Sequence, residues 1–215
     1  YDRIGGSRRA LELLEITPAA YVSVERDAEC QPVLTRAFPG VTSCIGIERV
    51  NDVQLRAAIP PSVTKGLVVG SPRLGPPDGR SNEIPQFVAL VLQLRELSKG
   101  AIQWDWMLES VASLSDSERE LVTRELEPLG EKSLYRYDAS EIGPIHRSRL
   151  YWTSWKPYFD NTMWEELECL PHKDYVRVQR PEGHHLTGEE FLDEGVRKCG
   201  DKPFPTSVRH IPRAS

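Results

Sequence analysis

Two periodicities of apolar and polar positions follow each other along the first 157 residues. Helical spacing predicts helices over residues 7 to 15, 28 to 37, 84 to 97 and 115 to about 126. Short apolar or alternating runs predict strands over residues 20 to 24, 65 to 71, 102 to 108, 134 to 137 and 150 to 153. Because strands and helices take turns, we expect an α/β domain whose parallel sheet is covered by helices on both faces.

The pattern changes after residue 157, where proline and glycine interrupt the chain at short intervals. We therefore predict two parts, an α/β domain over residues 1 to 157 and an irregular region over residues 158 to 215. The total of 215 residues is that of one domain of ordinary size with an appendage.

Charge and composition exclude several classes of protein. The chain has 27 Lys and Arg against 32 Asp and Glu, a net charge of −5, which argues against coating nucleic acid by bulk charge. A local basic face remains possible. No apolar run approaches the roughly 20 residues that span a bilayer, so we expect no membrane protein.

The number and spacing of the cysteines indicate the redox environment in which the protein is found. The four cysteines are widely spaced in a chain that needs no disulfides, which favours reduced thiols inside the cell. The chain starts at Tyr1 rather than at a methionine, and we expect it to be an excerpt of a longer protein.

Polar residues gather where the predicted strands end, which is where open parallel sheets bind ligands. Glu25 ends the second predicted element, Asn51-Asp52-Val53 follows later, and Gly70-Ser71-Pro72 ends another strand. Gly5-Gly6 lies about 20 residues before Glu25, the spacing of a glycine turn and a ribose-binding acid. The alternative is ordinary, because glycines often precede helices and a strand-end acid often meets only solvent.

Several short motifs in order resemble those of DNA (cytosine-5) methyltransferases, most closely the catalytic domain of the de novo type. They are Tyr1-Asp2-Arg3-Ile4-Gly5-Gly6, Val24-Glu25, Asp52-Val53, Gly70-Ser71-Pro72, Leu108-Glu109-Ser110-Val111 and His146-Arg147-Ser148-Arg149. The later Glu165-Glu166-Leu167-Glu168-Cys169-Leu170 and Phe204-Pro205-Thr206 resemble segments that lead toward the target-recognition part of the family.

This resemblance implies a three-layer Rossmann-like methyltransferase fold, S-adenosylmethionine as cofactor and cytosine-containing DNA as partner. It also implies a possible protein partner of the same family and, in a eukaryote, a nuclear location. The cofactor-binding residues that it implies are Tyr1, Asp2, Ile4, Gly5, Gly6, Glu25, Asp52, Val53, Ser71 and Pro72. Among these, Glu25 would hold the ribose hydroxyls and Asp52 would lie near the adenine amine.

For catalysis the resemblance implies Glu109 on the flipped cytosine, with Arg147 and Arg149 supporting the base, the catalytic loop or a phosphate. An ordinary reading competes here as well. Glu109 could be a solvated acid near a strand end, and the arginines could form surface ion pairs.

The sequence departs from the family at the nucleophile. Cytosine C5 accepts a methyl group only after a thiolate has added to C6, but Arg73 stands at the nucleophile position, by replacement or by a deletion in the loop. No cysteine lies between Cys44 and Cys169, and we expect Cys30 and Cys44 to be small buried hydrophobes. Arginine stays protonated and cannot attack.

Other departures are Arg3 in place of a glycine, Ser110 in place of an asparagine, and the lack of a returning segment that completes the cofactor pocket. We therefore expect an impaired or inactive methyltransferase. The alternative is a catalytically dead binding or regulatory module, and a decayed copy would show the same losses.

Two further readings are weaker. Cysteines and histidines near the C-terminus invite a zinc site, but their spacing matches no established framework, and we expect no metal. Trp104 and Trp106 alternate within a predicted strand, which favours a core or interface position over stacking on bases.

Overall fold

The computed structural model describes residues 4–72, 83–141, 146–156, 165–167 and 176–179 of the chain. The chain divides into two compact units. The first contains Tyr1–Ser110, Leu114–Lys132 and Trp152–Trp155, and the second contains the rest. Residues 133–151, which the sequence analysis assigned to the α/β domain, thus belong to the second unit. The predicted domain boundary near residue 157 stays a prediction.

The first unit alternates helices and strands, as the periodicity predicts. Its elements are α1 (Gly6–Leu13), β1 (Val22–Val24), α2 (Cys30–Ala37), β2 (Thr42–Cys44), η1 (Ile47–Arg49), α3 (Asp52–Ala58), β3 (Lys65–Gly70), α4 (Ile84–Ser98), most of β4 (Gln103–Val111), α5 (Asp116–Glu125) and η2 (Glu127–Leu129). The sequence analysis missed β2 and α3, because three and seven residues are too few to establish a period.

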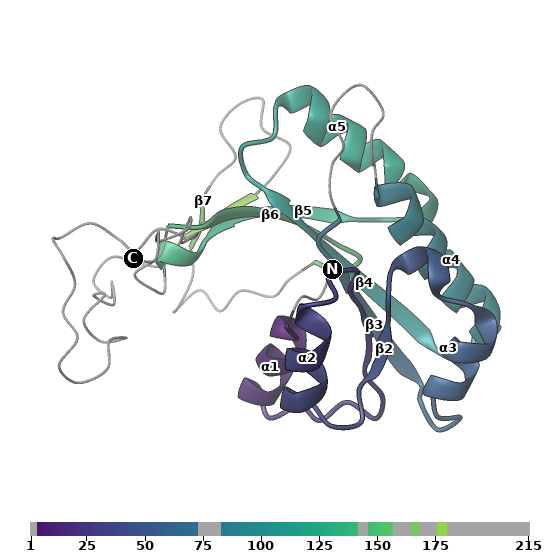
Figure 1. The fold of residues 1–215 in the computed structure, drawn as a ribbon. Helices are drawn as coiled ribbons and strands as arrows, with labels where there is room; N and C mark the ends of the chain where they lie inside the picture. Colours follow the sequence, from purple (N-terminus) through teal and green to yellow (C-terminus); the bar gives the residue numbers. More distant parts are fainter. Residues whose placement is uncertain (1–3, 73–82, 142–145, 157–164, 168–175, 180–215) are drawn as a thin grey trace, which may run out of the picture. The chain divides into compact units, whose positions relative to one another are not determined.

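Parallel pairing dominates the strands of this unit. β1 pairs in parallel with β2, with Val22 opposite Thr42, and β3 pairs in parallel with β4, with Lys65 opposite Gln103. The strand that follows β4 in the sheet is β6 (Ser148–Thr153). Just after it the Ser154 amide donates to the carbonyl of Trp106 at 3.0 Å. Helices α3 and α4 lie on one side of these strands, and α1 and α2 on the other (Figure 1).

The core of the first unit forms along α4. Its buried residues recur at helical spacing and are Ile84, Phe87, Val88, Val91 and Leu94. The edge of the Phe87 ring meets the indole of Trp106 with centroids 6.3 Å apart, and Trp106 is fully buried on β4. The core position predicted for Trp106 is confirmed, and Trp104 is half-buried.

Local sequence fixes the start of α5. Ser115 accepts from the amide of Glu118, and the Glu118 carboxylate accepts from the amide of Ser115 at 2.8 Å. This reciprocal capping box is the one predicted from Ser115-Asp116-Ser117-Glu118, because the two side chains satisfy amides that the helix leaves without partners.

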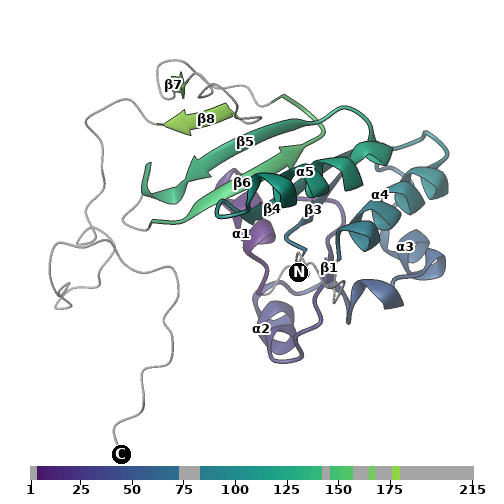
Figure 2. The ribbon, with the colours of Figure 1, turned by 90° about the horizontal axis from the view of Figure 1, so that it is seen from above.

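The second unit contains β5 (Ser133–Asp138), η3 (Ala139–Glu141), the first part of β6, β7 (Glu165–Leu167) and β8 (Val176–Gln179). Its strand order is β6-β5-β8-β7, with β8 parallel to β5 and β7 antiparallel to β8. Figure 2 shows β6, β5 and β8 side by side. Within the region after residue 157 that the sequence analysis predicts to be irregular, the described residues form the short strands β7 and β8, which have too few residues for a pattern and are defined by pairing across the sheet.

Candidate functional site

Glu25 stands directly after β1 and is 5% exposed. Its carboxylate Oε1 accepts from the Asp27 amide at 2.9 Å, its own amide donates to the Cys44 carbonyl at 3.0 Å, and its carbonyl accepts from Gln31 Nε2 at 2.7 Å. These bonds fix Glu25 at the carboxyl end of the β1–β2 pair. A buried carboxylate held in one orientation is a preorganised acceptor for hydroxyl groups.

Arg26 connects this strand end to two later segments. Its Nη2 donates to Glu48 Oε2 at 3.3 Å, and its Nη1 lies 3.5 Å from Glu83 Oε1. Glu83 precedes α4 and is 5% exposed. The pKa of Glu48 is lowered, chiefly by a hydrogen bond from its own backbone; desolvation opposes this, and the charge and hydrogen bond of Arg26 with the charge of Arg49 lower the pKa further. The guanidinium thus ties the end of β1 to η1 and to the start of α4.

Sequence reasoning missed this bridge. Glu48 comes 22 positions after Arg26, and Glu83 comes 35 positions after Glu48, so no local motif connects the three residues. Only the charge alternation Glu25-Arg26-Asp27 could have drawn attention to the first of them.

The segment Asn51-Asp52-Val53 begins α3. Asn51 caps the helix by accepting from the Gln54 amide at 3.0 Å, and Asp52 Oδ1 accepts from Gln93 Nε2 of α4 at 2.6 Å. Val53 is 77% exposed, and Ile45, which follows β2, is 49% exposed. Exposed apolar side chains after a strand end offer the kind of surface that a flat aromatic ring covers.

Gly5 and Gly6, expected at the cofactor, differ in their surroundings. Gly5 is buried and has φ +86°, and a Cβ there would collide with the side chains of Leu34 in α2 and of Phe38 just after it. Gly6 is exposed, and a Cβ there would meet no atom within 4 Å. Ile4 is 56% exposed. Gly5 therefore has a packing reason to be glycine, whether or not a cofactor is bound. Tyr1, Asp2 and Arg3 lie outside the described residues.

At the end of β3, Ser71 is exposed and Pro72 is buried, while Arg73 lies outside the described residues. Cys44 ends β2, is buried, and burial raises the pKa of its thiol. Cys30 is half-buried at the start of α2. The expectation that Cys44 is a small buried hydrophobe is confirmed, and its thiol is poorly suited to act as a thiolate nucleophile at neutral pH.

Glu109 is half-buried. It lies within β4 and not after it, because the strand ends at Val111, three residues farther than predicted. Glu109 belongs to the first unit, whereas Arg147 and Arg149 belong to the second.

In the second unit Arg147 is exposed and Arg149 is half-buried. The Arg147 amide donates to Asp138 Oδ1 at 3.0 Å, and Arg149 Nη1 donates to the Ser148 carbonyl at 2.9 Å. Desolvation, the largest influence on Asp138, raises its pKa. Hydrogen bonds from Ser140 and the Arg147 amide, with the charge of His146, outweigh it and leave the pKa lowered.

The zinc reading rests on residues outside the described part of the chain. Within the described residues, histidine, cysteine and acidic side chains form no group of three that could hold a metal ion. Among the helices in that same part, none is long and apolar enough to cross a bilayer.

No known protein-family profile matches the chain, and no curated protein matches it. Several solved methyltransferases share its fold. A DNMT2 variant from Spodoptera frugiperda superposes with a TM-score of 0.58 at 19% identity, over 92% of this chain and 59% of its own. The Entamoeba histolytica methyltransferase EhMeth gives 0.54 at 14% identity, over 92% and 59%. The S. pombe Dnmt2 methyltransferase gives 0.50 at 16% identity, over 74% and 51%.

The chain thus spans between half and three-fifths of the length of these neighbours. At these identities the likeness establishes the fold. The predicted α/β, Rossmann-like methyltransferase fold is confirmed.

Proposed function

We propose that this chain is a DNA (cytosine-5) methyltransferase-type domain that binds S-adenosylmethionine and does not transfer a methyl group to cytosine by itself. The observation that carries the cofactor part is Glu25, a buried carboxylate held in place at the end of β1. Placed there, it is suited to accept hydrogen bonds from a pair of ribose hydroxyls.

Residues that come later in the sequence than Glu25 are suited to the rest of the cofactor. Val53 and Ile45 offer exposed apolar surface for the adenine ring, and Asp52 offers a carboxylate for its amine. The cofactor would supply an electrophilic methyl group. These residues would bind and orient it, with Ser71 and Pro72 after β3 and the glycine turn before α1.

The proposed loss of catalysis rests on the missing nucleophile. Arg73 stands where the resembling family has its cysteine, and the nearest cysteine before it, Cys44, is buried with a raised pKa. Without a group that adds to C6, C5 of cytosine is too weak a nucleophile to take the methyl group. Glu109, Arg147 and Arg149 would then contact a base or phosphate without completing the reaction.

DNA is the proposed partner, and the likeness of the motifs to the de novo type suggests a family member as a second partner in the nucleus of a eukaryote. The second candidate function, a catalytically dead binding or regulatory module, is favoured by Arg73 alone. This second function, unlike the first, does not require that the cofactor binds, because such a module can also act through DNA or a protein partner.

Isothermal titration with S-adenosylmethionine tests the cofactor site. We expect the native chain to bind and Glu25→Gln to bind about tenfold more weakly or worse, because hydrogen bonds to a charged acceptor are lost. Glu120→Gln, which changes an exposed acid on α5, is the matched control and should bind like the native chain.

A folded native chain that releases no heat would refute the cofactor site and leave the binding-module reading. A parallel assay of methyl transfer to cytosine in duplex DNA should find no product. Methylation of C5 by the purified native chain would overturn the proposed loss of catalysis.

A further inference from the structure

Gln31 is the second residue of α2 and connects three elements around Glu25. Its side-chain Nε2 donates to the carbonyl of Glu25 at 2.7 Å, and its Oε1 accepts from the hydroxyl of Ser43 in β2. One half-buried side-chain amide thus ties the start of α2 to the end of β1 and to the neighbouring strand.

The bond to the Glu25 carbonyl lies just past the end of the strand ladder. The last residue pair of β1 and β2 is Val24 opposite Cys44, and the Glu25 amide donates to the Cys44 carbonyl at 3.0 Å. Glu25 is therefore held by the ladder through its amide and by Gln31 through its carbonyl. Because the peptide groups on both sides of the residue are fixed, its Cα–Cβ bond points in one direction.

The turn that follows β1 holds the carboxylate itself. Glu25 Oε1 accepts from the Asp27 amide at 2.9 Å, and Asp27 Oδ1 accepts from the Glu29 amide at 3.0 Å. The place of the Asp27 amide depends on the peptide group between Glu25 and Arg26, whose oxygen is the atom that Gln31 holds. Rotation of this peptide group would move the Asp27 amide and, with it, the carboxylate oxygen that it binds.

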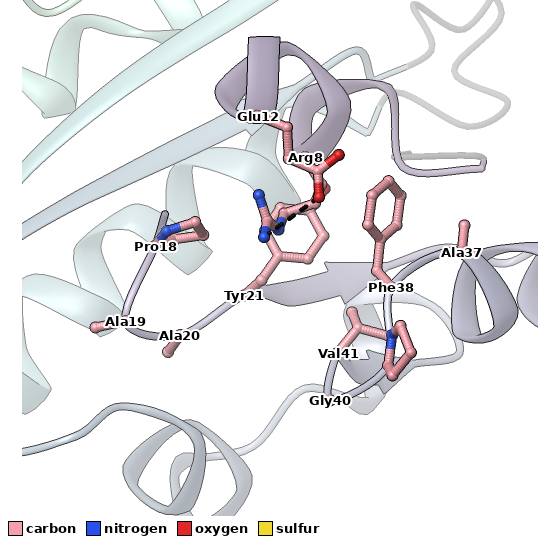
Figure 3. Close-up of a pocket in the computed structure, with 11 residues that line it drawn as sticks. Arg8, Glu12, Pro18, Ala19, Ala20, Tyr21, Ala37, Phe38, Gly40 and Val41 are labelled. Atoms are coloured by element: carbon pink, nitrogen blue, oxygen red, sulfur yellow. Dashed lines mark ion pairs between the residues drawn. The ribbon is translucent and has the colours of Figure 1, made fainter. Parts of the chain in front are cut away.

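Gln31 is in turn anchored by α2. Leu34 comes one helical turn later and is fully buried, so the two residues share the inward face of the helix. The helix ends beside a cavity of about 210 Å³, lined by Arg8, Tyr21 and Phe38 among others, and Gln31 does not belong to that lining (Figure 3). The packed part of α2 therefore supports Gln31, at the opposite end of the helix from the cavity.

We propose that Gln31 is a positioning residue for the ribose of the cofactor, because it holds the turn after β1 so that the Glu25 carboxylate faces both ribose hydroxyls. This inference rests on the proposed function, since it assigns how the same site selects a ribose. Gln31 acts through Glu25 and does not contact the ligand. Ser43 belongs to the arrangement, because its hydroxyl keeps the Gln31 amide oriented with its nitrogen toward the Glu25 carbonyl.

The experiment is isothermal titration of the full chain with two probes, S-adenosylmethionine and its 2′,3′-dideoxy analogue. We expect the native chain to bind the first about tenfold more tightly or better, since the analogue lacks the hydroxyls that donate to the carboxylate. Gln31→Leu should bind S-adenosylmethionine about tenfold more weakly than the native chain and bind the analogue equally well. Gln103→Leu, at an exposed glutamine at the start of β4, is the matched control and should keep both native affinities.

Two further measurements separate positioning from folding. Gln31→Leu is checked for native circular dichroism, and in the absence of cofactor its Asp27 amide should exchange several-fold faster than in the native chain. Ser43→Ala, at an exposed position, leaves Glu25 and Gln31 in place and removes the hydroxyl that orients the Gln31 amide. It should lower the preference for S-adenosylmethionine over the analogue about threefold.

The proposal is overturned if folded Gln31→Leu keeps the native preference, if it loses affinity for both probes alike, or if Ser43→Ala keeps the whole preference. Glu25→Gln distinguishes this failure from that of the proposed function. If Glu25→Gln loses the preference and Gln31→Leu keeps it, the positioning role alone is wrong. If the native chain binds neither probe, the cofactor site and the positioning role are both wrong.

Discussion

Gly5 is the residue whose replacement tests the structure most directly, because two separate penalties meet there. It precedes α1 with φ +86°, a conformation that favours glycine. A Cβ at this position would lie 2.4 Å from a ring carbon of Phe38 and 2.8 Å from Leu34 Cδ1. Leu34 is fully buried, so it has little room to move.

The expected loss for Gly5→Ala follows from these two terms. The left-handed backbone costs an alanine about 1–2 kcal/mol. Forcing a methyl group into a packed contact costs about 1–3 kcal/mol more. The sum of about 2–5 kcal/mol is a large part of the roughly 5–15 kcal/mol that stabilises a typical domain.

Two control variants separate the terms. Gly100 also has a positive φ, +81°, but a Cβ there meets no atom within 4 Å, so Gly100→Ala should lose only about 1–2 kcal/mol. Gly6 is open and begins α1, so Gly6→Ala should be neutral or stabilise by up to about 1 kcal/mol.

The assay is urea unfolding of the four proteins by circular dichroism, with hydrogen exchange of the α2 amides as the local readout. We expect the order Gly6→Ala, native, Gly100→Ala and Gly5→Ala from most to least stable. If Gly5→Ala unfolds with the same free energy as Gly100→Ala, the close packing of α1 on α2 is wrong. If it matches Gly6→Ala, the backbone conformation is wrong as well.

Two further predictions concern local contacts. Ser115→Ala removes the capping box of α5 and should lower the free energy of unfolding by about 1 kcal/mol, measured by urea unfolding, while Ser113→Ala, outside the box, should change it little. The lowered pKa of Asp138 means that its bonds to Ser140 and Arg147 are fully present above the ordinary aspartate pKa of about 3.9 and are lost as the pH falls through the lowered value. Protection of these two amides against hydrogen exchange should therefore stay constant from about pH 6 down to about pH 4 in the native chain and fall only at lower pH. In Asp138→Ala, which removes the acceptor, protection should already be low at about pH 6, and an unchanged pattern in that variant would contradict the assignment.

The sequence by itself determined the elements whose information is local. α4 could be predicted because five buried residues recur along 15 positions, and the capping box of α5 because its two residues are three apart. The absence of a cysteine between Cys44 and Cys169 is likewise a property of the sequence.

Part of the candidate site could also be predicted, since Glu25 directly follows a recognisable strand. The hydrogen bonds that hold Glu25 in place could not be predicted. The Cys44 carbonyl that accepts from the Glu25 amide belongs to β2, a strand of three residues that is too short to show a periodic pattern.

Only the tertiary structure decided which distant residues meet. It brought Arg26 to Glu48 and Glu83, Gly5 to Phe38, and Arg8 to a cavity bordered by the chain before β1 and after α2. The tertiary structure also pairs β7 with β8, two strands that no periodicity in the sequence predicts. Charge pairing, close approach and strand pairing depend on the path of the chain, and that path is set by burial of the whole core rather than by any short segment.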